Sequence, residues 1–133
     1  MLKHIFLFSL LSCTSLQNKI DNNFVAKIES NFFQICSEKK VACKKVPISI
    51  QDLSKKRPQD GAVCFHNKEI IIDYKQWRSY TSIKKEILLL HELGHCSLDL
   101  PHGEGIMNPK LVEESFYLEN KLKLIENLFK NPN

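Results

Sequence analysis

The stretch HELGHCSLDLPH, residues 91–102, constrains the fold more than any other part of the chain, because it holds three of the five histidines. His91 and His95 are four residues apart, so a helix would place their side chains one above the other on one face. His102 lies seven residues beyond His95, which is about 10 Å along a continuous helix. The three imidazoles can therefore meet only if the helix ends after His95 and the chain turns back.

The residues around the third histidine supply the means for that turn. Asp99 tolerates the left-handed backbone conformation that ends many helices, and Pro101 cannot continue a helix interior. Gly103 and Gly105 give the following segment further conformational freedom. We therefore expect the helix to end just before Asp99 and His102 to return towards its face.

The pattern H-E-x-x-H within this stretch is typical of zinc sites. Two imidazole nitrogens one helical turn apart can bind one Zn²⁺ at about 2.0–2.1 Å, and His102 would be the third protein ligand. Glu92 is rotated by about 100° from His91, so it lies beside the metal and can act on a water instead of ligating. Three ligands with an open fourth position are typical of catalytic zinc. The alternative is a solvated helix face that carries the histidines by chance.

The stretch and the residues that follow it, Gly-Ile-Met-Asn-Pro at 105–109, resemble the metzincin metallopeptidases. That family carries H-E-x-x-H-x-x-G-x-x-H, followed by a turn with a methionine beneath the zinc. The resemblance implies that the three histidines bind one zinc ion in a zincin-like domain. It also implies that Glu92 is the general base of peptide-bond hydrolysis and that Met107 is the methionine of the turn.

The spacing departs from the metzincin signature in several places. His102 comes one residue later than the third histidine of the family, and Leu98 stands where the helix-ending glycine would be. Asp99 can take over the left-handed role of that glycine. No tyrosine follows Met107 at the position that some metzincins use to support the transition state. Oxyanion stabilisation would then fall to the zinc or to another donor.

Three further residues are expected to have packing or surface roles. Gly94 lies between the two helical histidines, where glycine costs about 1 kcal/mol relative to alanine. Close packing against the methionine turn is the expected reason. Met107 itself is expected to pack and not to ligate, because a thioether is a poor partner for zinc. His66 is expected to be exposed beside a turn instead of acting as a fourth ligand.

These residues predict a zinc metalloendopeptidase, in which a zinc-activated water attacks the peptide bond and Glu92 is the general base. The substrate would be a peptide or protein, and an extended substrate can pair with an exposed edge strand. The alternative is a non-catalytic, zinc-stabilised envelope lipoprotein that acts as a binding module. Glu92 favours the peptidase, because a purely structural zinc site does not need it.

The first residues, MLKHIFLFSLLSC, have the organisation of an export signal, in which Lys3 precedes an apolar run that ends at a serine and Cys13. The run is far shorter than the roughly twenty residues needed to cross a bilayer. The tetrapeptide LLSC resembles the bacterial lipobox, in which a peptidase cleaves before the cysteine and the cysteine carries lipid. We predict a lipoprotein-type signal peptide over residues 1–12 and a polar tether over 13–23. The alternatives are an ordinary secretory signal and a buried N-terminal strand.

Export changes how the remaining cysteines are interpreted. Four cysteines remain, which are Cys36, Cys43, Cys64 and Cys96. An even number of cysteines in an exported chain is typical of disulfides. Four cysteines allow three pairings. We favour Cys36 with Cys43, which closes a short loop, and Cys64 with Cys96, which joins a strand to the histidine helix. A cysteine zinc site has less support, because the sequence contains no C-x-x-C pair.

The composition suits one compact domain, which we place at residues 24–133, since the chain has 133 residues of which 43% are hydrophobic. The formal net charge is +4 and the lysines are scattered, so no nucleic-acid partner is expected. We expect a monomer in the bacterial cell envelope, anchored to a membrane by lipid on Cys13. The outer membrane or periplasm is favoured, because Thr14 and not aspartate follows that cysteine.

Apolar periodicity predicts an α+β fold, with a mainly antiparallel sheet, an active-site helix, and flanking N- and C-terminal helices. The expected elements are a helix over 24–37 capped by Asp21, Asn22 or Asn23, strands over 45–50, 62–66 and 69–74, a helix capped by Ser82, and a last helix. The second and third strands would form a hairpin, and Pro47 places the first strand at or near an edge. The expected buried side of the last helix is Phe116, Leu118, Leu122, Ile125, Leu128 and Phe129.

Overall fold

The computed structural model describes residues 6–53 and 61–130, with side chains from residue 16 onwards. Within these ranges the chain forms four α-helices and a three-stranded mixed sheet, which confirms the α+β class. The helices are α1 (Phe6–Lys39), α2 (Tyr74–Ser79), α3 (Ser82–Leu98) and α4 (Glu114–Leu128), with a short 3-10 helix, η1, at Gly105–Met107. The strands are β1 (Ile48–Gln51), β2 (Ala62–Phe65) and β3 (Glu69–Asp73).

The sheet has the strand order β1-β3-β2, so β3 is central and the other two strands form its edges. β2 and β3 form the expected antiparallel hairpin, with His66 and Asn67 in the left-handed region at its turn (φ 50° and 55°). β1 pairs with β3 in parallel, so the prediction of a mainly antiparallel sheet is wrong. Ten residues separate β1 from β2 in the sequence, which is long enough for β1 to take the other edge of β3. The edge position predicted from Pro47 is confirmed.

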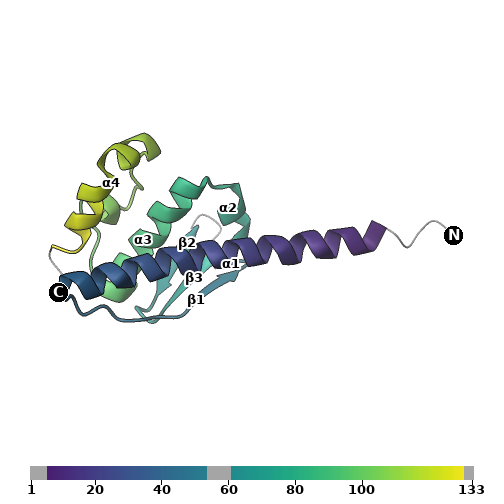
Figure 1. Ribbon diagram of the computed structural model, residues 1–133, viewed down its shortest axis with the longest axis horizontal. Coiled ribbons are helices and arrows are strands. Elements are labelled where there is room, and N and C mark those ends of the chain that lie inside the picture. The colour runs from purple at the N-terminus through teal and green to yellow at the C-terminus, as the bar shows by residue number, and fades with distance from the viewer. Residues whose placement is uncertain (1–5, 54–60, 131–133) are drawn as a thin grey trace.

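α1 is much longer than predicted, because it begins at Phe6 and continues to Lys39. This segment contains neither glycine nor proline, so no residue stops the helix. The predicted tether over 13–23 is therefore helical, and the predicted caps are wrong. Asp21 is instead buried, and its Oδ1 lies 3.8 Å from Lys85 Nζ. The C-terminal half of α1 packs on the domain, while its N-terminal part extends beyond it (Figure 1).

α3 is the central helix of the domain and carries the histidines. Its N-cap is Thr81, whose hydroxyl accepts a hydrogen bond from the Lys84 N–H at 3.1 Å, and not the expected Ser82. It ends at Leu98, as predicted, because Asp99 adopts the left-handed conformation (φ 54°, ψ 32°). From its second turn onwards the helix is mostly buried, so His91 and Glu92 are buried and His95 is partly buried.

The core-facing side of α4 is only partly the one predicted: Ile125, Leu128 and Phe129 pack as expected, and the other three residues do not. Its core-facing residues are Tyr117, Leu124, Leu128 and the following Phe129, with Ile125 partly buried. Phe116, Leu118 and Leu122 are exposed, so their predicted burial is wrong. The Tyr117 hydroxyl donates to Glu86 of α3 at 2.7 Å. Because Glu86 accepts this hydrogen bond, the side of α4 that carries Tyr117 faces α3, and the side that carries Leu118 does not.

α2 is a short helix that the sequence did not predict. It follows β3 directly and has six residues, which is too short for a helical period to be visible. Trp77 on this helix has no exposed surface, and its ring packs edge-on against Phe24 of α1, with centroids 6.2 Å apart. α2 therefore joins the end of the sheet to the long N-terminal helix.

Both predicted disulfides are present. Cys36–Cys43 closes the chain after α1, and Cys64–Cys96 joins β2 to α3. Disulfides persist in oxidising compartments, so the pair indicates an exported environment. Among the helices that the structure describes, none combines the length and apolar character needed to cross a bilayer.

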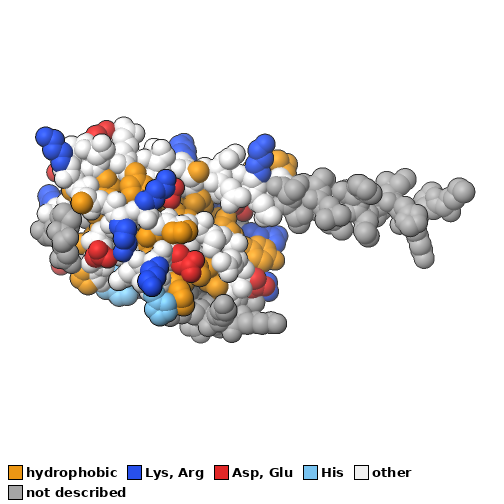
Figure 2. Space-filling model, turned by 90° about the horizontal axis from the view of Figure 1, so that it is seen from below, with side chains coloured by type: hydrophobic (Ala, Val, Ile, Leu, Met, Phe, Trp, Pro, Cys, Tyr) orange, Lys and Arg blue, Asp and Glu red, His pale blue; other side chains and the backbone are white. Residues whose placement is uncertain are grey.

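The surface mixes charges of both signs. Figure 2 shows lysine and arginine side chains interspersed with acidic and apolar ones over one face. Two ion pairs, Lys75 with Asp52 at 3.2 Å and Lys44 with Asp99 at 3.7 Å, are about half exposed. Exposed pairs of this kind contribute about 0–1 kcal/mol each. The fold therefore depends mainly on its buried core and its two disulfides.

Candidate metal centre

The three histidines of the stretch 91–102 meet beside α3. The Nε2 atoms of His91 and His95 are 3.1 Å apart. The ring centroid of His102 lies 5.3 Å from that of His91 and 4.7 Å from that of His95. One ring nitrogen of each residue lies within 4.8 Å of the others, so the group can hold a metal ion. In a tetrahedral zinc site two ligand nitrogens are about 3.3 Å apart, which is close to the His91–His95 separation.

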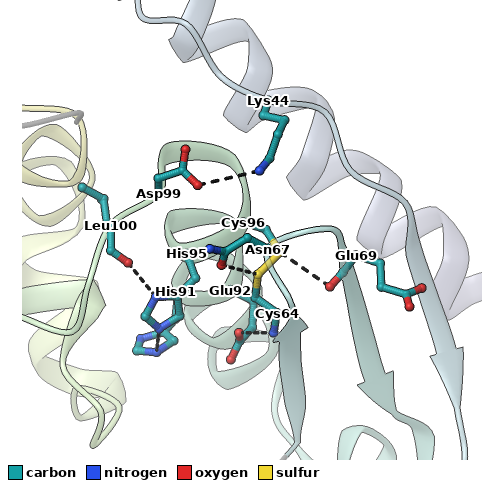
Figure 3. The surroundings of a disulfide bond; sticks show 10 residues. All are labelled: Lys44, Cys64, Asn67, Glu69, His91, Glu92, His95, Cys96, Asp99 and Leu100. Carbon is teal, nitrogen blue, oxygen red and sulfur yellow. Dashed lines mark hydrogen bonds and ion pairs between the residues drawn. A yellow bond between two sulfur atoms is a disulfide. The ribbon is translucent and has the colours of Figure 1, made fainter.

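Backbone carbonyls orient two of these rings. The His91 Nδ1–H donates to the Ile106 carbonyl at 2.6 Å, and the His95 Nδ1–H donates to the Leu100 carbonyl at 2.7 Å, the latter visible in Figure 3. A carbonyl oxygen can only accept, so each ring carries its proton on Nδ1 and presents the Nε2 lone pair to the common centre. Metal-binding histidines commonly have such partners. The donor set therefore fits a metal that prefers imidazole.

Burial also keeps these imidazoles in the form that binds metals. It lowers the pKa of both His91 and His95 below the ordinary histidine value, chiefly because the charged ring would lose its hydration. The nearby histidines lower the pKa further, while the carbonyl partners oppose the shift. The neutral ring is the metal ligand. The lowered pKa values thus favour the metal-binding form of His91 and His95.

His102 reaches the centre from an exposed segment between α3 and η1. The segment is fastened at both ends, because the Leu100 N–H donates to the Gly94 carbonyl and the Gly103 N–H donates to the Met107 carbonyl, each at 3.0 Å. These bonds hold the segment after Leu98 in a turn that returns to α3. The predicted return of the third histidine is therefore confirmed.

Met107 packs under the centre, against the helix position that bears no side chain. A Cβ atom added at Gly94 would collide with Met107 Sδ and lie 3.3 Å from Leu128 Cδ1. Met107 is buried, at 5% exposure. The close approach predicted at Gly94 is therefore confirmed, and it brings η1 against α3.

Glu92 lies beside the histidines on the side of α3 that faces β2. It is 7% exposed, and its Oε2 accepts a hydrogen bond from the Cys64 N–H at 2.7 Å (Figure 3). Cys64 is in turn bonded to Cys96, the residue that follows His95. A buried carboxylate thus stands next to the metal-binding group without being one of its three members.

An open groove of about 1120 Å³ runs past the histidines. One wall is the β2 edge, over residues 61–64, and the opposite wall is the segment 109–115 that leads into α4. The floor is one face of α3, formed by Lys84, Leu88, His91, Glu92 and His95. These positions recur at helical spacing, so the floor follows from the helix itself.

β2 turns backbone polar groups towards this groove. The Asp73 N–H donates to the Gly61 carbonyl at 2.9 Å, which marks these opposite residues as a hydrogen-bonded pair. Pairs alternate along an antiparallel ladder, so the N–H and carbonyl groups of Ala62 and Cys64 point away from β3. The bond from the Cys64 N–H to Glu92 agrees with this direction. The β2 edge therefore offers a row of peptide groups along the groove.

The sequence indicated the side chains of the centre but not the groups that orient them. The carbonyls of Leu100 and Ile106 and the N–H of Cys64 belong to the backbone, and no pattern of residue types reports them. The groove wall over 109–115 was also missed. Pro109, directly after the methionine turn, is the only sequence signal that an extended segment begins there.

No protein-family model, curated protein or solved structure matches this chain. The geometry of the centre and the groove is therefore the basis for its function.

Proposed function

We propose that the chain is a zinc-dependent metallopeptidase that hydrolyses peptide bonds in the groove along β2. The observation that supports this most is that three histidines converge at the groove floor with the buried carboxylate of Glu92 beside them. Among the described residues the metal-binding group has three members. Catalytic zinc sites keep three protein ligands and an open position, whereas structural sites are closed by four.

Each residue of the centre has a role in this proposal. His91, His95 and His102 hold the zinc ion. When bound, zinc supplies Lewis-acid chemistry, lowering the pKa of water towards about 7 and polarising the scissile carbonyl. Glu92 accepts the proton of the attacking water and delivers it to the leaving amine. Its burial shields this proton transfer from bulk solvent.

The substrate is an extended peptide that adds to the edge of β2. The N–H and carbonyl of Ala62 and the carbonyl of Cys64 can pair with it, since the Cys64 N–H already donates to Glu92; many proteins bind extended peptides at a strand edge in this way. Substrate side chains then alternate between the α3 floor and the open side of the groove. The segment 109–115 limits the groove opposite β2.

A zincin-like fold and kinship to the metzincins belong to the same proposal. The support is the combination of a buried H-E-x-x-H helix, an edge strand along it, and a methionine turn packed beneath it at Gly94. The third histidine arrives after a helix end at Asp99, where the family has glycine. The tyrosine of some metzincins has no counterpart directly after Met107.

The first prediction separates the peptidase from a zinc-stabilised binding module. Glu92→Ala should keep about one zinc per chain and an unchanged fold, while hydrolysis falls by roughly 10²- to 10⁴-fold, because a general base has been lost. His95→Ala and His102→Ala should both lose tight zinc binding, because two protein ligands remain. Metal content, zinc affinity and cleavage of a broad peptide library are the measurements. Undiminished cleavage by Glu92→Ala would remove the mechanism, and full zinc affinity in His102→Ala would remove the third ligand.

We also propose that the chain is an exported lipoprotein, cleaved before Cys13 and anchored by lipid on that residue. The support is the basic and apolar start, the LLSC tetrapeptide, and two disulfides that indicate an oxidising environment. The second prediction is that Cys13→Ser in the full chain leaves the precursor unprocessed and moves the protein out of the membrane fraction. Immunoblots of bacterial fractions would show this. Normal processing and membrane association in the variant would contradict it.

A further inference from the structure

We infer that the Cys64–Cys96 disulfide is a positioning device for Glu92, and that Cys64 is the residue through which it acts. This rests on the proposed function, since it assigns Glu92 a role in hydrolysis. The disulfide bridges the edge strand that lies over the groove and the helix that carries the histidines. Cys64 therefore has two attachments to α3, a covalent one through sulfur and a hydrogen bond from its N–H to Glu92.

The two attachments of Cys64 differ in what they hold. The sulfur joins Cys96, which is fully buried directly after His95, so it reaches the rigid part of α3. The N–H lies 2.7 Å from Glu92 Oε2, one turn earlier on the same helix. A bond from a backbone N–H to a carboxylate is charge-assisted and directional. The carboxylate thus accepts a hydrogen bond from the strand that the disulfide ties to α3 (Figure 3).

β2 gains from such a fastening because one of its two edges is left open to a substrate. It is a four-residue edge strand, paired only on its β3 side among the described residues. Its other side faces the groove, where a peptide would pair. A strand that binds substrate at its edge must not shift when the substrate arrives. A displacement of about 1 Å in a reacting group can lower the rate about 10²-fold.

The second disulfide of the chain provides a matched control. Cys36–Cys43 lies at the C-terminal end of α1, and neither cysteine lines the groove. A disulfide that acts only through stability would lower the melting temperature on removal and leave the kcat of the folded chain unchanged, at either position. A disulfide that positions Glu92 would affect turnover only at Cys64–Cys96.

The experiment compares zinc-loaded full chains of the wild type, C64S/C96S and C36S/C43S on one peptide that the wild type cleaves. Paired substitution avoids a free thiol that would compete for zinc. We expect C64S/C96S to keep zinc stoichiometry and KM within about threefold while kcat falls about 10- to 100-fold. C36S/C43S should keep the wild-type kcat, even where its melting temperature falls.

The outcomes separate this inference from the proposed function. An unchanged kcat in folded, zinc-loaded C64S/C96S overturns the inference alone. A kcat that falls only in proportion to zinc content also overturns it, because the disulfide would then hold the histidines. A wild type that binds zinc and cleaves nothing overturns the proposed function, and the inference with it.

A second measurement applies where C64S/C96S does not fold. In C36S/C43S the Cys64–Cys96 bond is the remaining described disulfide, and it can be reduced with a phosphine in the folded, zinc-loaded chain. The kcat should fall on reduction and return on reoxidation, with zinc retained throughout. Full activity after complete reduction, verified by thiol alkylation and mass spectrometry, would overturn the inference.

Discussion

Gly94 shows at the scale of one residue how the centre depends on close packing. It lies on α3 between His91 and His95, inside a buried part of the helix. Glycine there costs about 1 kcal/mol in helix propensity relative to alanine. The compensation is that η1 approaches closely enough for Met107 to pack directly against the helix backbone. The same turn carries the Ile106 carbonyl that orients His91.

The third prediction is that Gly94→Ala lowers both stability and metal affinity. The added methyl group would collide with Met107 Sδ, and overpacking of a buried site costs about 1–3 kcal/mol, more than the gain in helix propensity. Displacement of η1 should also weaken the His91–Ile106 bond. Urea denaturation and zinc titration measure the two effects. Gly103→Ala is the control, because its Cβ would have no neighbour within 4 Å and should change little.

The positions of the histidines were predictable, because they follow from local helix geometry. The hydrogen-bond partner of Glu92 was not, because it belongs to a segment distant in the sequence. The offsets of His95 and His102 from His91 are enough to require a helix that ends and a chain that returns. The partner of Glu92 depends on how β2 docks on α3, which is fixed by packing across the domain. No residue type near Glu92 in the sequence encodes that contact.

At the scale of elements, the end of α3 decides where the third histidine goes. Asp99 adopts positive φ, and the next residue contributes both an N–H to Gly94 and a carbonyl to His95. One left-handed residue therefore ends the helix, begins the return, and orients a ring of the centre. This role was predictable, since aspartate, proline and glycine follow each other closely there.

The fourth prediction concerns this helix end. Asp99→Val should lower the free energy of unfolding by about 1–2 kcal/mol, because a β-branched residue is strained in the left-handed region. It should also weaken zinc binding, because the Leu100 carbonyl that orients His95 would move. Asp99→Asn is the matched control, since asparagine tolerates that conformation and the lost ion pair with Lys44 is exposed. Equal stability and zinc affinity in the two variants would contradict the role given to the backbone.

The other helices show why element boundaries and faces are harder to predict than element type. α1 continues through the polar segment 13–23 because nothing there breaks a helix, although the residues alone look like a tether. α4 has apolar residues on two adjacent faces, and periodicity cannot choose between them. The choice depends on Glu86, on another helix, which accepts the Tyr117 hydroxyl. The direction in which β1 pairs is equally hard to predict from the sequence. β1 could pair with either strand of the hairpin, and the choice of strand decides whether the pairing is parallel or antiparallel.

At the scale of the whole molecule, a metal ion held by the three histidines would be thermodynamically coupled to the fold. The His91 ring is buried and the His95 ring is partly buried on α3, and the pKa of both is lowered, chiefly by burial. A bound metal would stabilise the folded chain, because the site exists only when α3 and the following segment are assembled. Without metal, the same rings are neutral groups that resist protonation in the folded state. Acid should therefore lower the free energy of unfolding of the metal-free chain, because these rings bind protons more readily in the unfolded state.

The fifth prediction follows from the sign of those shifts. In the unfolded chain histidine titrates near pH 6.5, and in the folded chain His91 and His95 titrate below it. Well above pH 6.5 these rings are neutral in both states, so they add little pH dependence there. As the pH falls below 6.5, the unfolded chain binds more protons, and the free energy of unfolding of the metal-free chain must fall. Urea denaturation with a chelator at pH 7.5, 6.5 and 5.5 measures this.

The control for the pH effect is a variant that lacks the buried rings. Asparagine does not titrate, so His91→Asn/His95→Asn should have a flatter dependence between pH 7.5 and 5.5, even if it is less stable overall. Carboxylates titrate mainly below this window and leave the comparison intact. Zinc should protect the wild type most at pH 7.5 and progressively less towards pH 5.5, because protons compete for the same Nε2 atoms. An identical slope in the double variant would show that burial of these histidines does not control the acid sensitivity of the fold.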